Sequence, residues 1–136
     1  MAKVPPLVGL ISRFGVTGLI NTSIGFCTAA GMDVGLHVAP ALANTAGYLV
    51  GVPVGFVLNR TFVFRHRQSI SATMPKYFVS VALAFAMNLL VLHIAGAALG
   101  PGVYQHLAAQ LCGMATYTVF NLLVCRYWVF PAEVAV

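Results

Sequence analysis

Four basic side chains stand at the ends of the apolar runs of this sequence, where they could bind an anion. They are Arg13, Arg60, Lys76 and Arg126. A guanidinium group binds phosphate oxygens through paired N–H donors, and a lysine ammonium group adds a compact positive charge. A set of such groups at one depth in a membrane would suit the phosphate of a lipid headgroup. The same residues could instead be anchors whose charged tips reach water and fix the depth of each helix. The residues alone leave both interpretations open.

Amide side chains inside the apolar runs are the second group with possible chemistry. Each run contains one: Asn21, Asn44, Asn88 and Asn121. An amide in hydrocarbon needs a hydrogen-bond partner, and bonds between membrane helices contribute on the order of 1 kcal/mol. These residues could therefore hold helices together, or they could line a polar groove and contact sugar hydroxyls. Asn21, Asn88 and Asn121 are the sugar-binding candidates, and the first two lie away from the predicted membrane ends.

The second apolar run has a stripe of small residues. Gly47, Gly51 and Gly55 are four residues apart, with Pro53 between the last two. Such a stripe allows close helix contact, and an internal proline removes one backbone hydrogen bond and kinks a helix. We interpret these four residues as a site of helix packing or as a hinge, and a dimer contact is the alternative.

Composition identifies the elements that must position these residues. Of the 136 residues, 60% are hydrophobic and only 7% are charged, and the mean hydropathy is +0.94. Soluble domains contain about 25% charged residues, so this composition excludes a soluble enzyme. It also excludes a disordered chain, which would need low hydrophobicity. Four apolar runs are long enough to cross a membrane as helices: about 14–32, 39–58, 77–99 and 106–125. We expect an all-α membrane protein in which residues 1–136 form a single transmembrane domain.

The placement of charge predicts the orientation of the chain. All seven basic residues fall on one side of a four-span arrangement, and none lies in the other two loops. The excess of positive charge marks the cytoplasmic side, so both termini are expected there. This placement indicates contact with membrane lipids and gives no reason to expect binding to nucleic acid, despite the net charge of +5.

The two halves of the sequence resemble each other. Residues 60–64 and 126–130 both read Arg, any residue, aromatic, Val, Phe, and Arg13-Phe14 corresponds to Lys76-Tyr77. We therefore predict two helical hairpins that are parallel repeats of one unit. The aromatic residues of the two endings, Phe130 among them, are predicted to form a belt at the membrane interface.

These features resemble the GtrA family of small bacterial membrane proteins. The resemblance covers about residues 10–131 and depends on the two endings, the four spans and the pattern Arg13-Phe14-x-x-Thr17-Gly18-x-x-Asn21-Thr22. It implies translocation of a polyprenyl-phosphate-linked sugar across the bacterial cytoplasmic membrane, for glycosyltransferases of cell-surface polysaccharide synthesis. The chain departs from the family at Gly25, where members often have an acidic residue. It also has Gly55 at the position that Asn121 occupies ahead of the second ending.

Other functions remain as alternatives. A non-transporting adaptor that recruits or stabilises a membrane glycosyltransferase ranks second. A small exporter of cationic drugs would need a carboxylate inside the first span, and no acidic residue lies within the predicted spans. We expect no catalytic residues, metal or cofactor, and therefore no enzyme. A homodimer is expected, because four helices enclose little volume.

Overall fold

The computed structural model describes residues 6–131, apart from the side chains of Pro40, Ala41 and Asn44. The interpretation of the Asn44 amide therefore lies outside the described residues, as does the predicted position of Lys3. The described part of the chain is helical and contains no strand. Four of its helices are long and apolar enough to cross a membrane, which confirms an all-α protein with four candidate spans.

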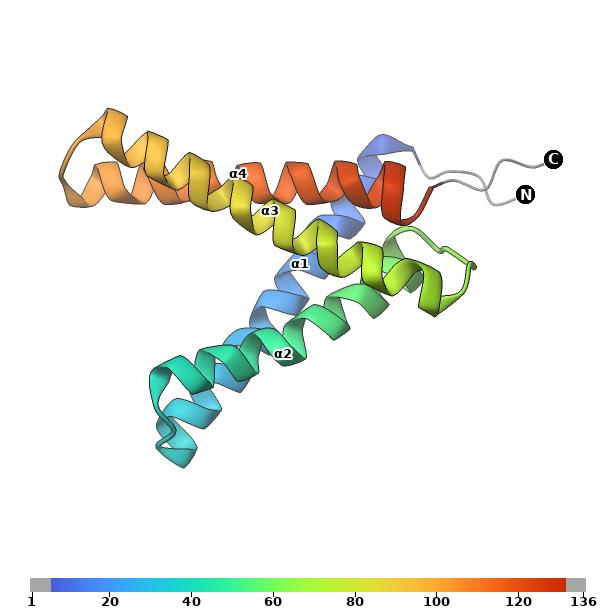
Figure 1. The fold of residues 1–136 in the computed structure, drawn as a ribbon, viewed down its shortest axis with the longest axis horizontal. Helices are drawn as coiled ribbons and strands as arrows, with labels where there is room; N and C mark the ends of the chain where they lie inside the picture. Colours follow the sequence, from blue (N-terminus) through green and yellow to red (C-terminus); the bar gives the residue numbers. More distant parts are fainter. Residues whose placement is uncertain (1–5, 132–136) are drawn as a thin grey trace. The chain divides into compact units, whose positions relative to one another are not determined.

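Short π-helical turns extend three of the four long helices. In chain order the elements are α1 (Leu7–Ala30), η1 (Gly31–Gly35), α2 (Pro40–Leu58), η2 (Asn59–Val63), α3 (Ile70–Leu99), α4 (Val103–Val124) and η3 (Cys125–Val129). The chain divides into two compact units at Arg67 and Gln68. We call the unit with α1 and α2 hairpin 1 and the unit with α3 and α4 hairpin 2. In each hairpin the two helices run side by side in opposite directions (Figure 1).

Two helices begin earlier than the apolar runs predicted. α1 begins at Leu7 and α3 at Ile70, although the runs begin near residues 14 and 77. Hydropathy marks the part of a helix that lies in hydrocarbon, whereas the helix continues as long as its backbone hydrogen bonds are made. Pro75 consequently lies inside α3 and not in the loop, where it removes one backbone donor near the start of the helix.

A residue with positive φ follows two of the π-helical turns. After η1 the chain reverses through His37, with φ of 53°, and after η2 it turns through Arg65, with φ of 50°. A left-handed residue just beyond a helix commonly ends it, because the backbone can then turn away from the helix axis. Gly100, with φ of 77°, has this position after α3. His37 and Gly100 thus lie where hairpins 1 and 2 fold back, and Arg65 lies in the connection between the hairpins.

Glycines allow close contact between α1 and α2. A Cβ added at Gly47 would lie 2.7 Å from the carbonyl oxygen of Gly25 and 3.3 Å from the Cβ of Ala29. A Cβ at Gly51 would lie 3.8 Å from the Asn21 amide. Gly47 and Gly51 therefore face α1 within hairpin 1, so a dimer contact would have to use other residues. Pro53 is half-buried within α2, and the carbonyl oxygen of Gly55 accepts a hydrogen bond from the Asn59 amide at 2.8 Å.

The outer faces of the helices are apolar and exposed. Large side chains such as Leu19, Phe26 and Leu111 are about 70% exposed, at 71%, 71% and 67%. In water such surfaces would be unfavourable, whereas in a bilayer they contact lipid at no such cost. Burial is therefore confined to narrow stripes where each pair of helices meets.

Candidate functional site

The Arg-aromatic-Val-Phe endings form π-helical turns. In η2 and η3 the arginine, Arg60 or Arg126, is the second residue of the turn. The backbone N–H of Phe64 donates to the carbonyl of Asn59 at 2.9 Å, and that of Phe130 donates to Cys125 at 2.8 Å. These bonds span five residues, which widens the helix, and single π turns occur frequently at functional sites. No local pattern in the sequence predicts this π geometry, and the shared motif is its only signal.

The residues of the two endings differ in how deeply they are buried. Val63 and Val129 are fully buried, and Phe130 is 3% exposed. The ring of Phe130 lies 6.3 Å from that of Tyr77, between centroids, at an interplanar angle of 43°. The prediction that Phe130 belongs to an interface belt is therefore wrong, because its ring packs against α3. Tyr127 and Trp128 remain substantially exposed.

Hairpin 1 brings its two basic candidates to the same end. Arg13 lies about two turns inside α1 rather than at the helix end, and its Cζ atom is 5.7 Å from the centroid of the Phe62 ring in η2. This distance allows a cation–π interaction that holds the guanidinium group beside the π turn. Arg60 belongs to the same turn, and both arginines are half-buried.

Hairpin 2 has a corresponding pair. Lys76 lies about two turns inside α3 and is half-buried. The next residue, Tyr77, contacts Phe130 beyond η3, so Lys76 and Arg126 occupy the same end of this hairpin. The Cζ atom of Arg126 is 5.5 Å from the centroid of the neighbouring Tyr127 ring. The structure therefore places two of the four cations at the same end of each hairpin.

Two of the three candidate amides have an oxygen without a partner. The Oδ1 atoms of Asn21 and Asn88 are buried and make no hydrogen bond within the described residues. Asn21 faces Gly51, and Asn88 lies against Gly113, where an added Cβ would overlap its Oδ1 atom. Each amide thus points at a glycine of the facing helix. A glycine has no side chain that could act as a donor to the amide oxygen.

Asn121 differs because its oxygen is paired. The Ser80 hydroxyl donates to Oδ1 of Asn121 at 2.7 Å, and the thiol of Cys125 lies 3.7 Å from the same oxygen. All three side chains are buried between α3 and α4. This bond joins two helices, as expected of an amide that holds a bundle together.

Thr17 is a polar residue to which the sequence analysis assigned no chemistry. Its side chain is 2% exposed, and its hydroxyl oxygen is buried without a hydrogen bond in the described part of the chain. Leaving such a group unpaired costs about 1–3 kcal/mol. Ser80, which is 63 positions further along, has the partner that Thr17 lacks. The pairing of Ser80 cannot be recognised from sequence, because it depends on which residue of the facing helix lies opposite.

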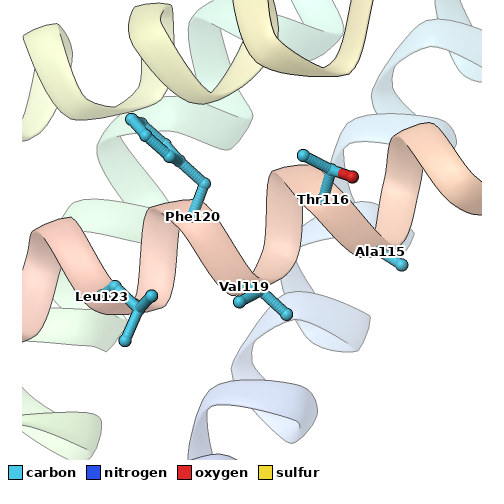
Figure 2. Close-up of a pocket in the computed structure, with 5 residues that line it drawn as sticks. All are labelled: Ala115, Thr116, Val119, Phe120 and Leu123. Carbon is cyan, nitrogen blue, oxygen red and sulfur yellow. The ribbon is translucent and has the colours of Figure 1, made fainter. Parts of the chain in front are cut away.

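Two surface hollows of the described residues are lined mainly by apolar side chains. One is a shallow hollow of about 420 Å³ along α4, lined by Ala115, Thr116, Val119, Phe120 and Leu123 (Figure 2). Another lies near the start of the same helix, at Gly102, Val103, His106 and Leu107. Neither has a charged lining residue. Within residues 6–131 there is also no cluster of His, Cys, Asp or Glu side chains that could hold a metal ion.

The fold and the comparisons together define the class. Four long apolar helices in two hairpins indicate a small multi-pass membrane protein. The family model described as GtrA/DPMS, transmembrane domain, matches residues 13–130, and the chain belongs to this family. The match begins at the first basic candidate and ends at the last residue of the second Arg-aromatic-Val-Phe ending. Membership confirms the resemblance and indicates a role in polysaccharide synthesis from lipid-linked sugars, in a family that is generally non-catalytic. No curated protein and no solved structure matches the chain.

Proposed function

We propose that this protein moves a polyprenyl-phosphate-linked sugar from the cytoplasmic to the outer leaflet of the bacterial cytoplasmic membrane. The sugar would then serve glycosyltransferases that build a cell-surface polysaccharide. The observation that carries this proposal is the pair of half-buried cations at one end of each hairpin, next to a π turn. Family membership supports the same substrate class.

Phosphate binding follows from the chemistry of these pairs. A lipid-linked sugar has an anionic phosphate between an apolar chain and a polar ring. The paired cations lie within about two turns of the ends of long apolar helices. Guanidinium groups bind phosphate oxygens through two parallel N–H donors. Arg60 and Arg126 would supply this contact, with Arg13 and Lys76 completing the positive charge.

The amides supply contacts for the sugar in this proposal. Asn21 and Asn88 each have a buried oxygen without a partner in the described structure, which a sugar hydroxyl could satisfy. Asn121 already accepts a hydrogen bond from Ser80. We therefore assign Asn121 to the packing of α3 against α4.

Symmetry and orientation form the next part of the proposal. Arg13 and Lys76 are 63 positions apart, and Arg60 and Arg126 are 66 apart. Two close helix approaches follow the same offsets, with Gly25 against Gly47 in hairpin 1 and Asn88 against Gly113 in hairpin 2. These matches support two parallel repeats of one hairpin. The basic residues favour a cytoplasmic location for both termini.

The second candidate function is a non-transporting adaptor for a membrane glycosyltransferase. One observation favours it: the two hollows described on α4 are shallow and mainly apolar, which suits helix contact better than passage of a sugar. A homodimer or a partner enzyme would then supply the missing surface. A transporter should move the lipid-linked sugar when it is purified alone, whereas an adaptor should not.

The test is transfer of a polyprenyl-phosphate hexose across proteoliposomes that contain the purified protein. We expect transfer by the wild type and at least tenfold slower transfer by Arg60→Ala and by Arg126→Ala, because each loses a charge-assisted phosphate contact worth about 1.5–3 kcal/mol. Arg67→Ala, in the loop between the hairpins, is the matched control, and its rate should stay near that of the wild type.

Two results would contradict the transporter. A well-folded wild type that moves none of several hexose lipids would leave the adaptor as the better proposal, to be tested by copurification with a glycosyltransferase. If Arg67→Ala slows transfer as much as Arg60→Ala does, positive charge in general, and not the paired cations, would be responsible for transfer.

A further inference from the structure

The Thr17 hydroxyl behaves differently from its neighbours on α1. The hydroxyls of Ser12, Ser23 and Thr28 donate to the carbonyl four residues earlier in their own helix, at 2.9, 2.9 and 2.8 Å. Thr17 makes no such bond, although it is almost completely buried. Its hydroxyl therefore lacks the backbone partner that the other three hydroxyls have. A buried hydroxyl with neither a backbone nor a side-chain partner among the described residues is unusual in a folded protein.

The register of hairpin 1 shows what lies opposite Thr17. Gly25 faces Gly47, and Asn21 faces Gly51. Because α1 and α2 are antiparallel, one further turn places Thr17 opposite Gly55. Gly55 is buried but has no side chain that could pair with the hydroxyl. Two polar groups of α1 thus face two glycines of α2.

In hairpin 2 the residues that correspond to Thr17 and Gly55 form a hydrogen-bonded pair. Ser80 is 63 positions after Thr17, and Asn121 is 66 positions after Gly55. Here the hydroxyl and the amide form a hydrogen bond of 2.7 Å. Hairpin 1 keeps the hydroxyl and lacks the amide. A ligand with a hydroxyl group could form the hydrogen bond that the amide forms in hairpin 2.

We propose that Thr17 and Asn21 form a polar site in hairpin 1 that binds hydroxyl groups of the sugar on a lipid phosphate. The inference rests on the proposed function and adds Thr17 as a specificity-determining residue. A sugar hydroxyl both donates and accepts, so adjacent hydroxyls can accept from Thr17 and donate to the oxygen of Asn21.

The position of the site relative to the cations fits this ligand. Thr17 and Asn21 are four and eight residues beyond Arg13 on α1, or about 6 and 12 Å along the helix. A phosphate held at Arg13 and Arg60 would therefore place its attached sugar near Thr17. In hairpin 2 the unpaired Asn88 is twelve residues beyond Lys76, about 18 Å away. This makes hairpin 1 the sugar-selective half.

The experiment compares two ligands and three substitutions in nanodiscs of the full chain. Binding is measured for a polyprenyl-phosphate hexose and for the same polyprenyl phosphate without sugar. Thr17→Val removes the hydroxyl and keeps the shape, Thr17→Ser keeps the hydroxyl, and Gly55→Asn supplies the partner seen in hairpin 2. Ser80→Ala is the matched control in hairpin 2.

We expect the wild type to prefer the glycosylated lipid, and Thr17→Val to reduce that preference by roughly three- to tenfold. Affinity for the bare phosphate lipid should stay within about twofold. Gly55→Asn should reduce the preference in the same way, whereas Thr17→Ser and Ser80→Ala should keep it. Thr17→Val removes an unpaired hydroxyl, so its thermal stability should not fall, which guards against a folding artefact.

Distinct outcomes would overturn this inference and the proposed function. If the wild type prefers the glycosylated lipid and Thr17→Val does not change that preference, the sugar site is elsewhere while the proposed function stands. Equal loss of preference in Ser80→Ala would also overturn the assignment to hairpin 1. If the wild type binds neither lipid, the proposed function fails, and this inference fails with it.

Discussion

Whether a buried polar side chain of this protein has a hydrogen-bond partner depends on the residue that faces it. Ser80 faces an asparagine and makes a short hydrogen bond, whereas Asn21 faces a glycine. The side-chain oxygens of Asn21 and Thr17 have no partner among the described residues. In the hydrocarbon of a membrane no water can bond to such atoms. An unpaired polar atom therefore lowers the stability of the fold unless a ligand forms a hydrogen bond with it. The Ser80–Asn121 bond is the clearest example of a stabilising pair.

At this scale we predict that Ser80→Ala lowers the free energy of unfolding by about 1 kcal/mol. The substitution leaves the buried Asn121 oxygen with only the weak thiol donor of Cys125 at 3.7 Å. Reversible unfolding in mixed micelles would measure the change. Ser23→Ala is the control, because its exposed hydroxyl bonds only to its own helix and its removal should change stability by less than about 0.5 kcal/mol. Equal stability of the Ser80 variant and the wild type would contradict the structural role.

Each hairpin has a close contact between its two helices and, at one end, a π turn that widens the helix. Gly47 lets α2 approach α1 at the level of Gly25, and the π turns η2 and η3 carry the arginines at the other end. Small residues permit the van der Waals contact that drives helix association in lipid. The close contact fixes the register, and the register decides which polar residues face each other.

For the hairpin we predict that Gly47→Ala lowers the free energy of unfolding by about 1–3 kcal/mol. The new Cβ would lie 2.7 Å from the backbone oxygen of Gly25, so the helices would have to separate. Gly18→Ala serves as the control, since its Cβ would meet no atom within 4 Å, and it should be neutral or stabilising. Both variants can be compared by thermal unfolding in detergent. A Gly47 variant that unfolds like Gly18→Ala would refute the close contact.

The whole molecule is organised by the distribution of charge on apolar helices. Of the described basic residues, Arg65 and Arg67 lie in the connection between the hairpins. The paired cations lie at the ends of their hairpins that hold η2 and η3. Basic residues flanking a span are retained in the cytoplasm during insertion. The proposed orientation therefore follows from charge placement and does not depend on the packing of the two hairpins.

We predict that reporters fused after Gln68 and after Val136 are cytoplasmic, whereas reporters after Gly35 and Gly100 reach the outer side. Alkaline phosphatase and green fluorescent protein fusions in bacterial cells would report the two locations. Exchange of Arg65 and Arg67 for glutamine should produce a mixed orientation, because it removes two of the retained charges. Phosphatase activity at residue 68 of the unaltered chain would show that the predicted orientation is wrong.

The sequence by itself determined the class of the protein and the location of its helices. Twenty-residue apolar runs predict spans because the thickness of the bilayer requires that length, whatever the neighbours of a helix are. The motif around Arg60 and Arg126 and the pattern at Arg13 also sufficed to recognise the family that the comparison confirmed. Such features are properties of short stretches of chain.

Only the tertiary structure decided which residues meet. Hydropathy did not locate the starts of α1 and α3, because helices continue beyond hydrocarbon. It placed Phe130 in a belt, whereas the ring packs against Tyr77, 53 positions earlier in the chain. The Ser80–Asn121 bond joins residues 41 positions apart, and the unpaired oxygen of Asn21 faces a glycine 30 positions later in the chain. These facts depend on the register between helices, which is set by packing over their whole length and leaves no local pattern in the sequence.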